Sequence, residues 1–308
     1  MRTPFRVWEV LVTLSAIKKA GNITAACKTL FISQPALSQR LSSIEANIGC
    51  PVFNRDVTPL KMTFEGELYY DKLKKFVLMD KDFKNQLYEL KQNNTGRITL
   101  AMSPMRTQLF LVPLMLQMKQ RLPNVDFKLV HGSNREELYQ LVLDGSADFM
   151  INSVFYLSLQ QIKLCTGEEL LALPPSHPYA KKFAGKSWRE APAVSLHAFS
   201  NDTFILHYAS QGGRKLSELV FQSENFFPSK YFEVFDYYTI LQLIQAEMGC
   251  SVLTSTNIAA LSSSFNITYL RPLHRVICPL YISFRKGMYL TSAMNEFVSL
   301  CKSVFSDC

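Results

Sequence analysis

Apolar residues recur at helical spacing in three segments at the start of the chain. The first segment runs from Pro4 to Ala20 and stops at Gly21, a residue type that commonly ends helices. A short second helix is expected after Thr24, whose hydroxyl can cap it, and a third helix after Ser33, with Pro35 tolerated in its first turn. The apolar stripe of the first helix is formed by Phe5, Trp8, Leu11, Val12 and Ala16. The pattern predicts a small unit of three helices.

The third helix has two different sides. At 100° per residue its apolar side chains fall within about 40° of one another. These side chains are Leu37, Leu41, Ile44 and Ile48. The opposite arc carries small or amide-bearing residues, namely Gln34, Pro35, Ser38, Gln39 and Ser42. Slim side chains with amides and hydroxyls suit close approach to base edges in a major groove, while a solvated amphipathic helix would show the same pattern.

The segments around the third helix favour DNA binding. A short helix, a three-residue turn and a second helix with an outward polar arc form a helix-turn-helix. Two short apolar runs follow in GCPVFNRDVTPLKMT and predict a two-stranded wing, on which Arg55 and Lys61 are expected to meet phosphates or the minor groove. The predicted DNA contacts are Thr24, Ser33, Gln34, Pro35, Ser38, Gln39, Arg40, Ser42, Arg55 and Lys61.

Residues 64–90 predict one long helix, because the segment lacks proline and its only glycine, Gly66, lies near the start, where Thr63 can cap the helix. Its apolar spacing alternates by four and three, as in a coiled coil, along Tyr69, Leu73, Phe76, Asp80, Phe83, Leu87 and Leu90. A helix of about 40 Å is longer than a small winged domain can cover, so the seam is expected to pair with a second subunit. A two-fold dimer, alone or within a tetramer, would bind an inverted-repeat site in duplex DNA.

After the polar segment 91–96, KQNNTG, strands and helices alternate in two rounds, over 97–152 and 203–254. This order predicts two α/β lobes with a cleft between them. Open sheets bind ligands beyond the carboxyl ends of their strands, which here are the loops SPMRTQ and ASQGG. Ser210 can cap the helix that follows the second loop. Both loops favour an anionic or carboxylate-bearing small molecule, although ordinary helix capping also explains any single serine or threonine there.

Composition narrows the class of protein. The chain has 308 residues, 48% apolar and 19% charged, and no apolar run long enough to span a bilayer, so no membrane partner is expected. The apolar start contains Trp8 and Glu9 and is not followed by a small-residue cleavage site, which argues against a secretory signal. Seven scattered cysteines without a CxxC pair fit reduced thiols in a cytoplasm, and no metal or cofactor site is expected. Much of the net charge of +8 lies in residues 1–63, as suits a polyanionic partner.

The sequence also bears on two rival functions. An enzyme is not expected, because the chain has no GxSxG, HExxH, Walker loop or GxGxxG and its five histidines are scattered. A cytoplasmic small-molecule-binding protein without regulatory DNA binding stays as the alternative, opposed by the basic N-terminal unit.

The segment AACKTLFISQPALSQRLSSIEANIGCPVFNR, with the later LKMTFEG, resembles the winged helix-turn-helix of the LysR-type transcriptional regulators. The positions in register are Ala25, Ala26, Leu30, Ser33 to Ser38, Ile44, Glu45, Gly49, Val52, Phe53, Arg55, Met62, Thr63 and Gly66. Gln39 departs from the arginine that the family often has there, which leaves the base preference open. Pro51, Pro59 and Glu65 are also atypical.

The resemblance implies an α+β multidomain fold and a bacterial regulator that responds to a small molecule. A winged helix-turn-helix over 1–63 precedes a linker helix for dimerisation over 64–90, a hinge over 91–96 and an effector domain over 97–308. The effector domain would be two-lobed and similar to periplasmic binding proteins, with lobe one at about 97–153 and 274–308 and lobe two at about 156–270. Crossings would lie near 152–155 and 270–274, and a last helix over 291–305 would return to lobe one. Expected effector contacts are Ser103, Thr107, Asn152 and Gln211 from the family pattern, with Ser210 added from the capping argument.

Overall fold

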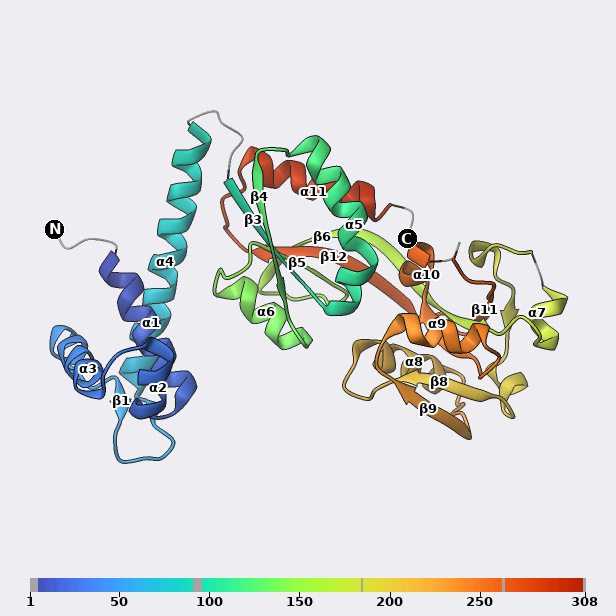
Figure 1. The fold of residues 1–308 in the computed structure, drawn as a ribbon, viewed down its shortest axis with the longest axis horizontal. Helices are drawn as coiled ribbons and strands as arrows, with labels where there is room; N and C mark the ends of the chain where they lie inside the picture. Colours follow the sequence, from blue (N-terminus) through green and yellow to red (C-terminus); the bar gives the residue numbers. More distant parts are fainter. Residues whose placement is uncertain (1–4, 91–95, 184, 262–263, 307–308) are drawn as a thin grey trace. The chain divides into compact units, whose positions relative to one another are not determined.

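The computed structural model describes residues 5–90, 96–183, 185–261 and 264–306 (Figure 1). The chain divides into two compact units, Met1–Gln92 and Asn93–Cys308, which are described separately. Pro4, the predicted start of the first helix, lies outside the described residues, as does the predicted hinge apart from Gly96.

The N-terminal unit is the predicted winged helix-turn-helix. Its elements are α1 Phe5–Ala20, α2 Ile23–Leu30, α3 Gln34–Ile48, β1 Phe53–Asn54, β2 Lys61–Met62 and α4 Phe64–Leu90. Strands β1 and β2 pair antiparallel as the wing. The core contains Leu14 and Ile17 of α1, while Trp8 of the predicted stripe is 57% exposed. That part of the prediction was wrong, because α2, α3 and α4 pack against the side of α1 that carries Leu14 and Ile17.

The cap of α2 also differs from the prediction. Gly21 has a left-handed backbone with φ of 66°, so the chain turns at once and Asn22 becomes the residue before the helix. The side-chain oxygen of Asn22 accepts a hydrogen bond from Ala25 N at 2.6 Å. Thr24, the predicted cap, lies inside the helix and is exposed.

Helix α4 has 27 residues and begins as predicted after Thr63. The Thr63 hydroxyl accepts from Gly66 N at 2.9 Å and donates to Pro51 O at 2.7 Å, which ties the start of the helix to the wing. Leu73 is buried in the core of the unit and Tyr69 is half-buried. The later seam positions are exposed, namely Phe76, Phe83, Leu87 and Leu90. The first part of the predicted seam therefore belongs to the core of the unit, and the later part is an exposed apolar surface.

The second unit is built around an eight-stranded sheet and two lobes. Its strands are β3 Gly96–Met102, β4 Val125–His131, β5 Phe149–Asn152, β6 Leu159–Leu173, β7 Ala193–Val194, β8 Thr203–His207, β9 Lys230–Val234, β10 Ser251–Thr254, β11 Thr268–Pro272 and β12 Ile277–Arg285. Its helices are α5 Pro104–Arg121, α6 Arg135–Leu143, α7 Pro178–Lys182, η1 Trp188–Glu190, η2 Leu196–Phe199, α8 Gly212–Ser223, α9 Tyr237–Gln245, α10 Ser255–Leu261 and α11 Ser292–Val304.

In the first lobe, β3 lies between β4 and β5 and is parallel to both. Helices α5 and α11 lie side by side along the sheet (Figure 1), where the rings of Phe110 and Phe305 are 4.6 Å apart. An ion pair of 2.6 Å joins Arg121 of α5 to Glu296 of α11. The last helix thus returns to the first lobe.

In the second lobe, β8 and β9 are parallel and α8 packs near β8 over a core of its own. The 15-residue strand β6 joins the lobes, because its first part pairs with β12 and its last part pairs with β10 and β11. The predicted crossing segments, 152–155 and 270–274, lead towards β6 and β12. Ser210 does not cap α8, because the helix begins at Gly212 with Gln211 as its cap residue and no side-chain cap bond.

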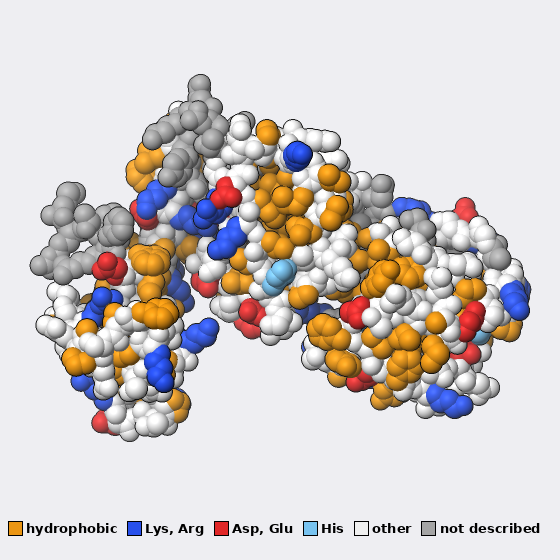
Figure 2. All heavy atoms as spheres, viewed as in Figure 1, with side chains coloured by type: hydrophobic (Ala, Val, Ile, Leu, Met, Phe, Trp, Pro, Cys, Tyr) orange, Lys and Arg blue, Asp and Glu red, His pale blue; other side chains and the backbone are white. Residues whose placement is uncertain are grey.

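The surface shows where apolar side chains are left uncovered. Figure 2 shows them gathered over α5, whose Val112, Met115 and Leu116 are exposed. None of the described helices combines the length and apolarity needed to cross a bilayer.

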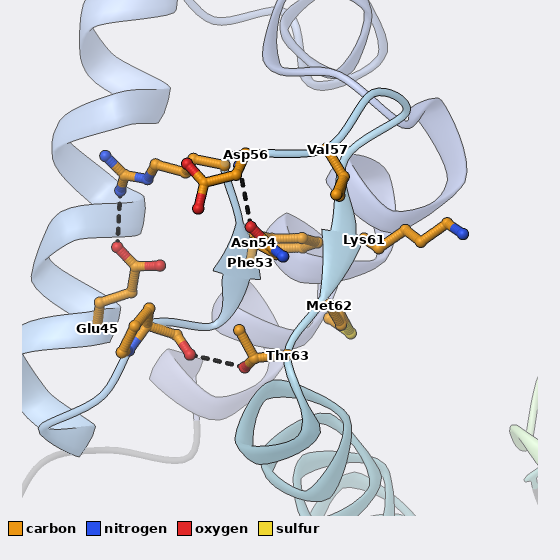
Figure 3. Close-up of a pocket in the computed structure, with 10 residues that line it drawn as sticks. Glu45, Phe53, Asn54, Asp56, Val57, Lys61, Met62 and Thr63 are labelled. Carbon is orange, nitrogen blue, oxygen red and sulfur yellow. Dashed lines mark hydrogen bonds and ion pairs between the residues drawn. The ribbon is translucent and has the colours of Figure 1, made fainter.

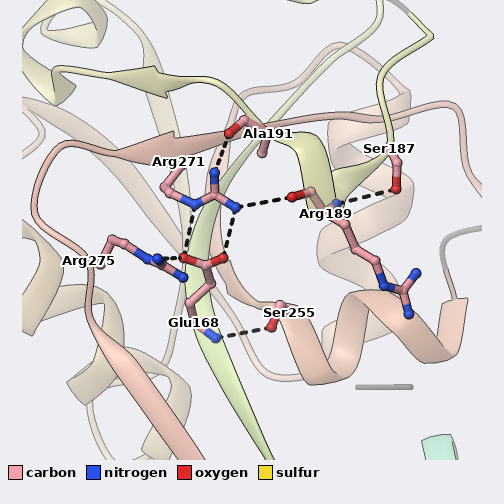
Figure 4. Close-up of polar contacts among 7 residues, drawn as sticks. All are labelled: Glu168, Ser187, Arg189, Ala191, Ser255, Arg271 and Arg275. Carbon is pink, nitrogen blue, oxygen red and sulfur yellow. Dashed lines mark hydrogen bonds and ion pairs between the residues drawn. The ribbon is translucent and has the colours of Figure 1, made fainter. Parts of the chain in front are cut away.

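Two neighbouring glutamates on β6 have opposite surroundings. The Glu168 carboxylate takes two hydrogen bonds from Arg271, at 2.9 and 3.0 Å, and one from Arg275 at 2.8 Å (Figure 4). Burial acts to raise the pKa of Glu168, but the two arginines outweigh it and lower the pKa. Arg271 also donates to Ala191 O at 2.6 Å, so one charge cluster joins β6, β11 and the segment after η1.

Glu169 is 1% exposed and accepts from the Thr254 hydroxyl and from Cys278 Sγ at 3.4 Å. None of the ion pairs in the described residues includes it. Burial raises the pKa of Glu169 to about 7, because the charged form loses its hydration without gaining a cation. The folded protein therefore holds a proton on Glu169 that the unfolded chain releases more readily.

We predict that Gly66→Ala destabilises the N-terminal unit by roughly 1–3 kcal/mol. A β-carbon at Gly66 would lie 2.2 Å from Val52 O, a backbone atom that cannot rotate away. Urea unfolding followed by Trp8 fluorescence in a Trp188→Phe background reports this unit. The exposed Glu65→Ala should cost less than about 1 kcal/mol, and equal midpoints for the two variants would contradict the close packing.

We predict that Glu169 makes stability depend on pH. Its raised pKa gives a contribution that is complete below the unfolded pKa of about 4.5 and is lost as the pH rises to about 7. Glu169→Gln, which cannot ionise, should flatten this part of the curve of unfolding free energy against pH. Glu190→Gln, on the exposed surface of η1, should leave the slope as it is, and an unchanged slope in Glu169→Gln would refute the assignment.

Candidate nucleic-acid interface and effector site

The predicted reading face of α3 is exposed along its whole length. The Ser33 hydroxyl caps the helix by accepting from Ala36 N at 3.4 Å. Leu37, Leu41 and Ile44 are buried. The exposed residues on the other side are Gln34, Pro35, Ser38, Gln39 and Ser42, as the sequence placed them. The side chains that can read bases therefore lie together on a surface that the chain does not cover.

Two further predicted contacts lie next to this face. Arg40 is exposed, and its Nη1 donates to the Thr13 hydroxyl of α1 at 3.4 Å. That bond ties the guanidinium towards α1 and limits its freedom. Thr24 is exposed near the start of α2.

The wing is fixed to α3 by Glu45, the single acidic residue of that helix. One Glu45 carboxylate oxygen accepts from Val52 N at 2.9 Å and the other pairs with Arg55 Nη2 at 2.8 Å. Glu45 and Arg55 line an open groove of about 890 Å³, and Figure 3 shows Lys61 extending away from Glu45. Arg55 thus helps to hold the wing against α3. Because 62% of its side chain stays exposed, it is also a cation on the surface. The only negative charge on α3 is used inside this bridge, which leaves its outer face without acids.

Several of the predicted effector residues form hydrogen bonds within the chain. Ser103 caps α5, and its carbonyl accepts from the Thr107 hydroxyl at 3.1 Å. Asn152 is 6% exposed, accepts from Ser283 Oγ at 2.6 Å and donates to Val154 O. The Gln211 amide donates to Phe235 O at 2.8 Å and accepts from Tyr208 N at 3.2 Å. Ser210 is exposed.

Sequence reasoning missed two arginines in this region. Arg106 lies in the first turn of α5 and donates to Ser153 Oγ at 3.2 Å, and Arg135 is the first residue of α6. The signal was present in the sequence, because helix N-termini favour acids and both positions carry cations.

No group of three or more His, Cys, Asp or Glu side chains in the described part of the chain is placed to hold a metal ion. Burial raises the pKa of the Cys250 and Cys301 thiols, as expected of packed side chains.

Comparisons with known proteins match both units. Residues 8–67 match the family described as "Bacterial regulatory helix-turn-helix protein, lysR family", and residues 91–306 match the "LysR substrate binding domain". The transcriptional regulator CysL of Bacillus subtilis is 24% identical, over 96% of this chain and 97% of its own. MetR of Haemophilus influenzae is 28% identical, over 50% of this chain and 49% of its own.

Solved structures show the same fold. Full-length CbnR complexed with its target DNA has a TM-score of 0.57 at 18% identity, covering 98% of this chain and 100% of that one. Full-length BenM has a TM-score of 0.54 at 18% identity, covering 96% and 95%. Because the family matches cover both units in order along nearly the whole chain, this protein belongs to the LysR family of transcriptional regulators, with a DNA-binding helix-turn-helix domain and an effector-binding domain.

Proposed function

We propose that the outer face of α3 enters the major groove of duplex DNA and that the wing touches the flanking backbone. The observation that supports this proposal is that the small polar residues of α3 are exposed while its apolar side is buried. The proposed contacts are Thr24, Ser33, Gln34, Pro35, Ser38, Gln39, Arg40, Ser42, Arg55 and Lys61. Amides and hydroxyls read base edges, and the cations hold phosphates.

The protein assembles through α4. The exposed fractions of Phe76, Met79, Phe83 and Leu90 are 59%, 66%, 56% and 80%. Apolar side chains this exposed along one helix favour a partner, because their burial stabilises an assembly by about 25 cal/mol for each Å² removed from water. A two-fold pair of subunits, as a dimer or within a tetramer, presents two reading helices to an inverted repeat about 34 Å apart.

The effector is a small anionic molecule, such as a carboxylate, bound at the lobe junction. Ser103 caps α5 and Thr107 lies in its first turn, while Ser210 and Gln211 precede α8. The internal hydrogen bonds of Asn152 give it a positioning role there. An effector regulates only if it binds two arrangements of the protein unequally. The protein acts on DNA in the cytoplasm and does so without catalysis.

We predict that Gln34→Ala and Ser38→Ala each weaken binding to the preferred DNA site by roughly 1–3 kcal/mol and leave binding to unrelated DNA unchanged, because each removes a base contact. Ser43→Ala is the matched control, since Ser43 is exposed on α3 outside the polar arc. Lys61→Ala should weaken all sequences alike and reduce the slope of log K against log salt by about 1. Fluorescence anisotropy over a salt series measures each effect. Full sequence preference in Gln34→Ala and Ser38→Ala would refute the reading face.

We predict that Phe83→Glu separates the subunits, because it places a charge in an apolar interface. Sedimentation equilibrium should show a smaller species and weaker binding to a two-half-site DNA. Gln86→Glu adds the same charge at another exposed position of α4 and should keep the assembly. An unchanged mass for Phe83→Glu would exclude this surface as the interface.

A further inference from the structure

Arg106 and Arg135 are two cations of the effector-binding unit that lack an acidic partner. Among the described residues, neither guanidinium has a carboxylate within ion-pair distance. By contrast, Arg97, Arg121, Arg214, Arg271 and Arg275 all pair with acids. Arg106 and Arg135 thus differ from these five arginines.

Arg106 lies in an electrostatically unfavourable position in the protein alone. The first turn of α5 holds no acidic residue, and the helix dipole places positive potential there. Arg135 begins α6, where Glu136 and Glu137 lie beside it in the first turn. Desolvation, followed by the charge of Arg135, lowers the pKa of Arg106 to about 10. Burial and Glu169 raise the pKa of Cys278 on β12, while Arg106 and Arg135 both act against this rise. Both charges thus act on the same place beside β12.

Arg135 also reaches the other lobe. A β-carbon built on Gly212, the first residue of α8, would lie 3.4 Å from Arg135 Nη2. The first turn of α8 has no side-chain cap bond. One guanidinium of the first lobe therefore lies against the start of α8 in the second lobe.

We propose that Arg106 and Arg135 together hold the negatively charged group of the effector, an oxyanion such as a carboxylate, sulfate or phosphate. This assignment rests on the proposed effector function and adds the residues that select the ligand. An oxyanion there relieves the repulsion between the two cations and accepts charge-assisted hydrogen bonds from both. Because Arg135 adjoins α8, the bound anion also draws the start of α8 towards the first lobe.

Neighbouring groups are compatible with an anion at this place. Ser153 Oγ, which accepts from Arg106, orients that guanidinium. Glu169 is a buried acid in hydrogen-bond contact with Cys278, and burial favours its neutral form. A neutral Glu169 does not repel the ligand.

The test is isothermal titration calorimetry of the full-length protein with sulfate, inorganic phosphate and succinate. The three titrations show whether the site binds a sulfate, a phosphate or a carboxylate. At least one should bind the unaltered protein. Arg106→Gln and Arg135→Gln should each weaken that ion by about tenfold or more. Lys128→Gln removes a charge from an exposed position of β4 in the same lobe and should change the affinity by less than about twofold.

A second measurement separates binding from folding. Without ligand, Arg135→Gln should unfold at the same temperature as the unaltered protein or higher, because it removes a repulsion. A lower unfolding temperature would mean that Arg135 supports the fold. Binding of none of the three ions, or binding by either Arg variant as tight as by the unaltered protein, would overturn the two-arginine site. DNA binding by the same proteins is measured separately, so a failure of the anion site is distinguished from a failure of the regulator itself.

Discussion

The burial of Leu37, Leu41 and Ile44 decides which side of α3 can meet another molecule. These three side chains pack with Leu14 and Ile17 of α1 and with Ala26 of α2. Turning α3 about its axis would expose the apolar row and bury amides without partners, and both changes cost free energy. The polar arc therefore stays outward, and every proposed base contact depends on that orientation.

The wing depends on the same helix through one acidic side chain. Glu45 joins α3 to the wing through Val52 N and Arg55, and Thr63 joins the wing to the start of α4. The reading helix, the wing and the first turns of the long helix are thus held by short polar bridges over a shared core. A partner bound along the exposed apolar side of α4 would hold the reading face of α3 in register with a second copy.

In the effector-binding unit, some charged side chains stabilise the fold and others are available to bind a ligand. Glu168 is neutralised by two arginines, and this cluster fixes the second lobe around β6 and β11. Arg106 carries a charge in the first turn of α5 with no acid in that turn to offset it, and Arg135 of α6 has no ion pair of its own in the described residues. A charge that the fold leaves uncompensated is an expected feature of a site that a ligand completes.

The sequence by itself determined the helices of the N-terminal unit and which side of α3 faces outward. Helical periodicity and capping involve residues only three or four positions apart, so they can be recognised in the sequence. The caps at Ser33 and Thr63 followed from local spacing, as did the 27 residues of α4. Only the tertiary structure decided that Asn22 caps α2, that Trp8 faces solvent, and that the amides of Asn152 and Gln211 are engaged internally. It also paired Glu168 with Arg271 and placed Arg135 against Gly212. These partners lie far apart along the chain, and no local pattern encodes a contact that forms only when the sheet brings two distant segments together.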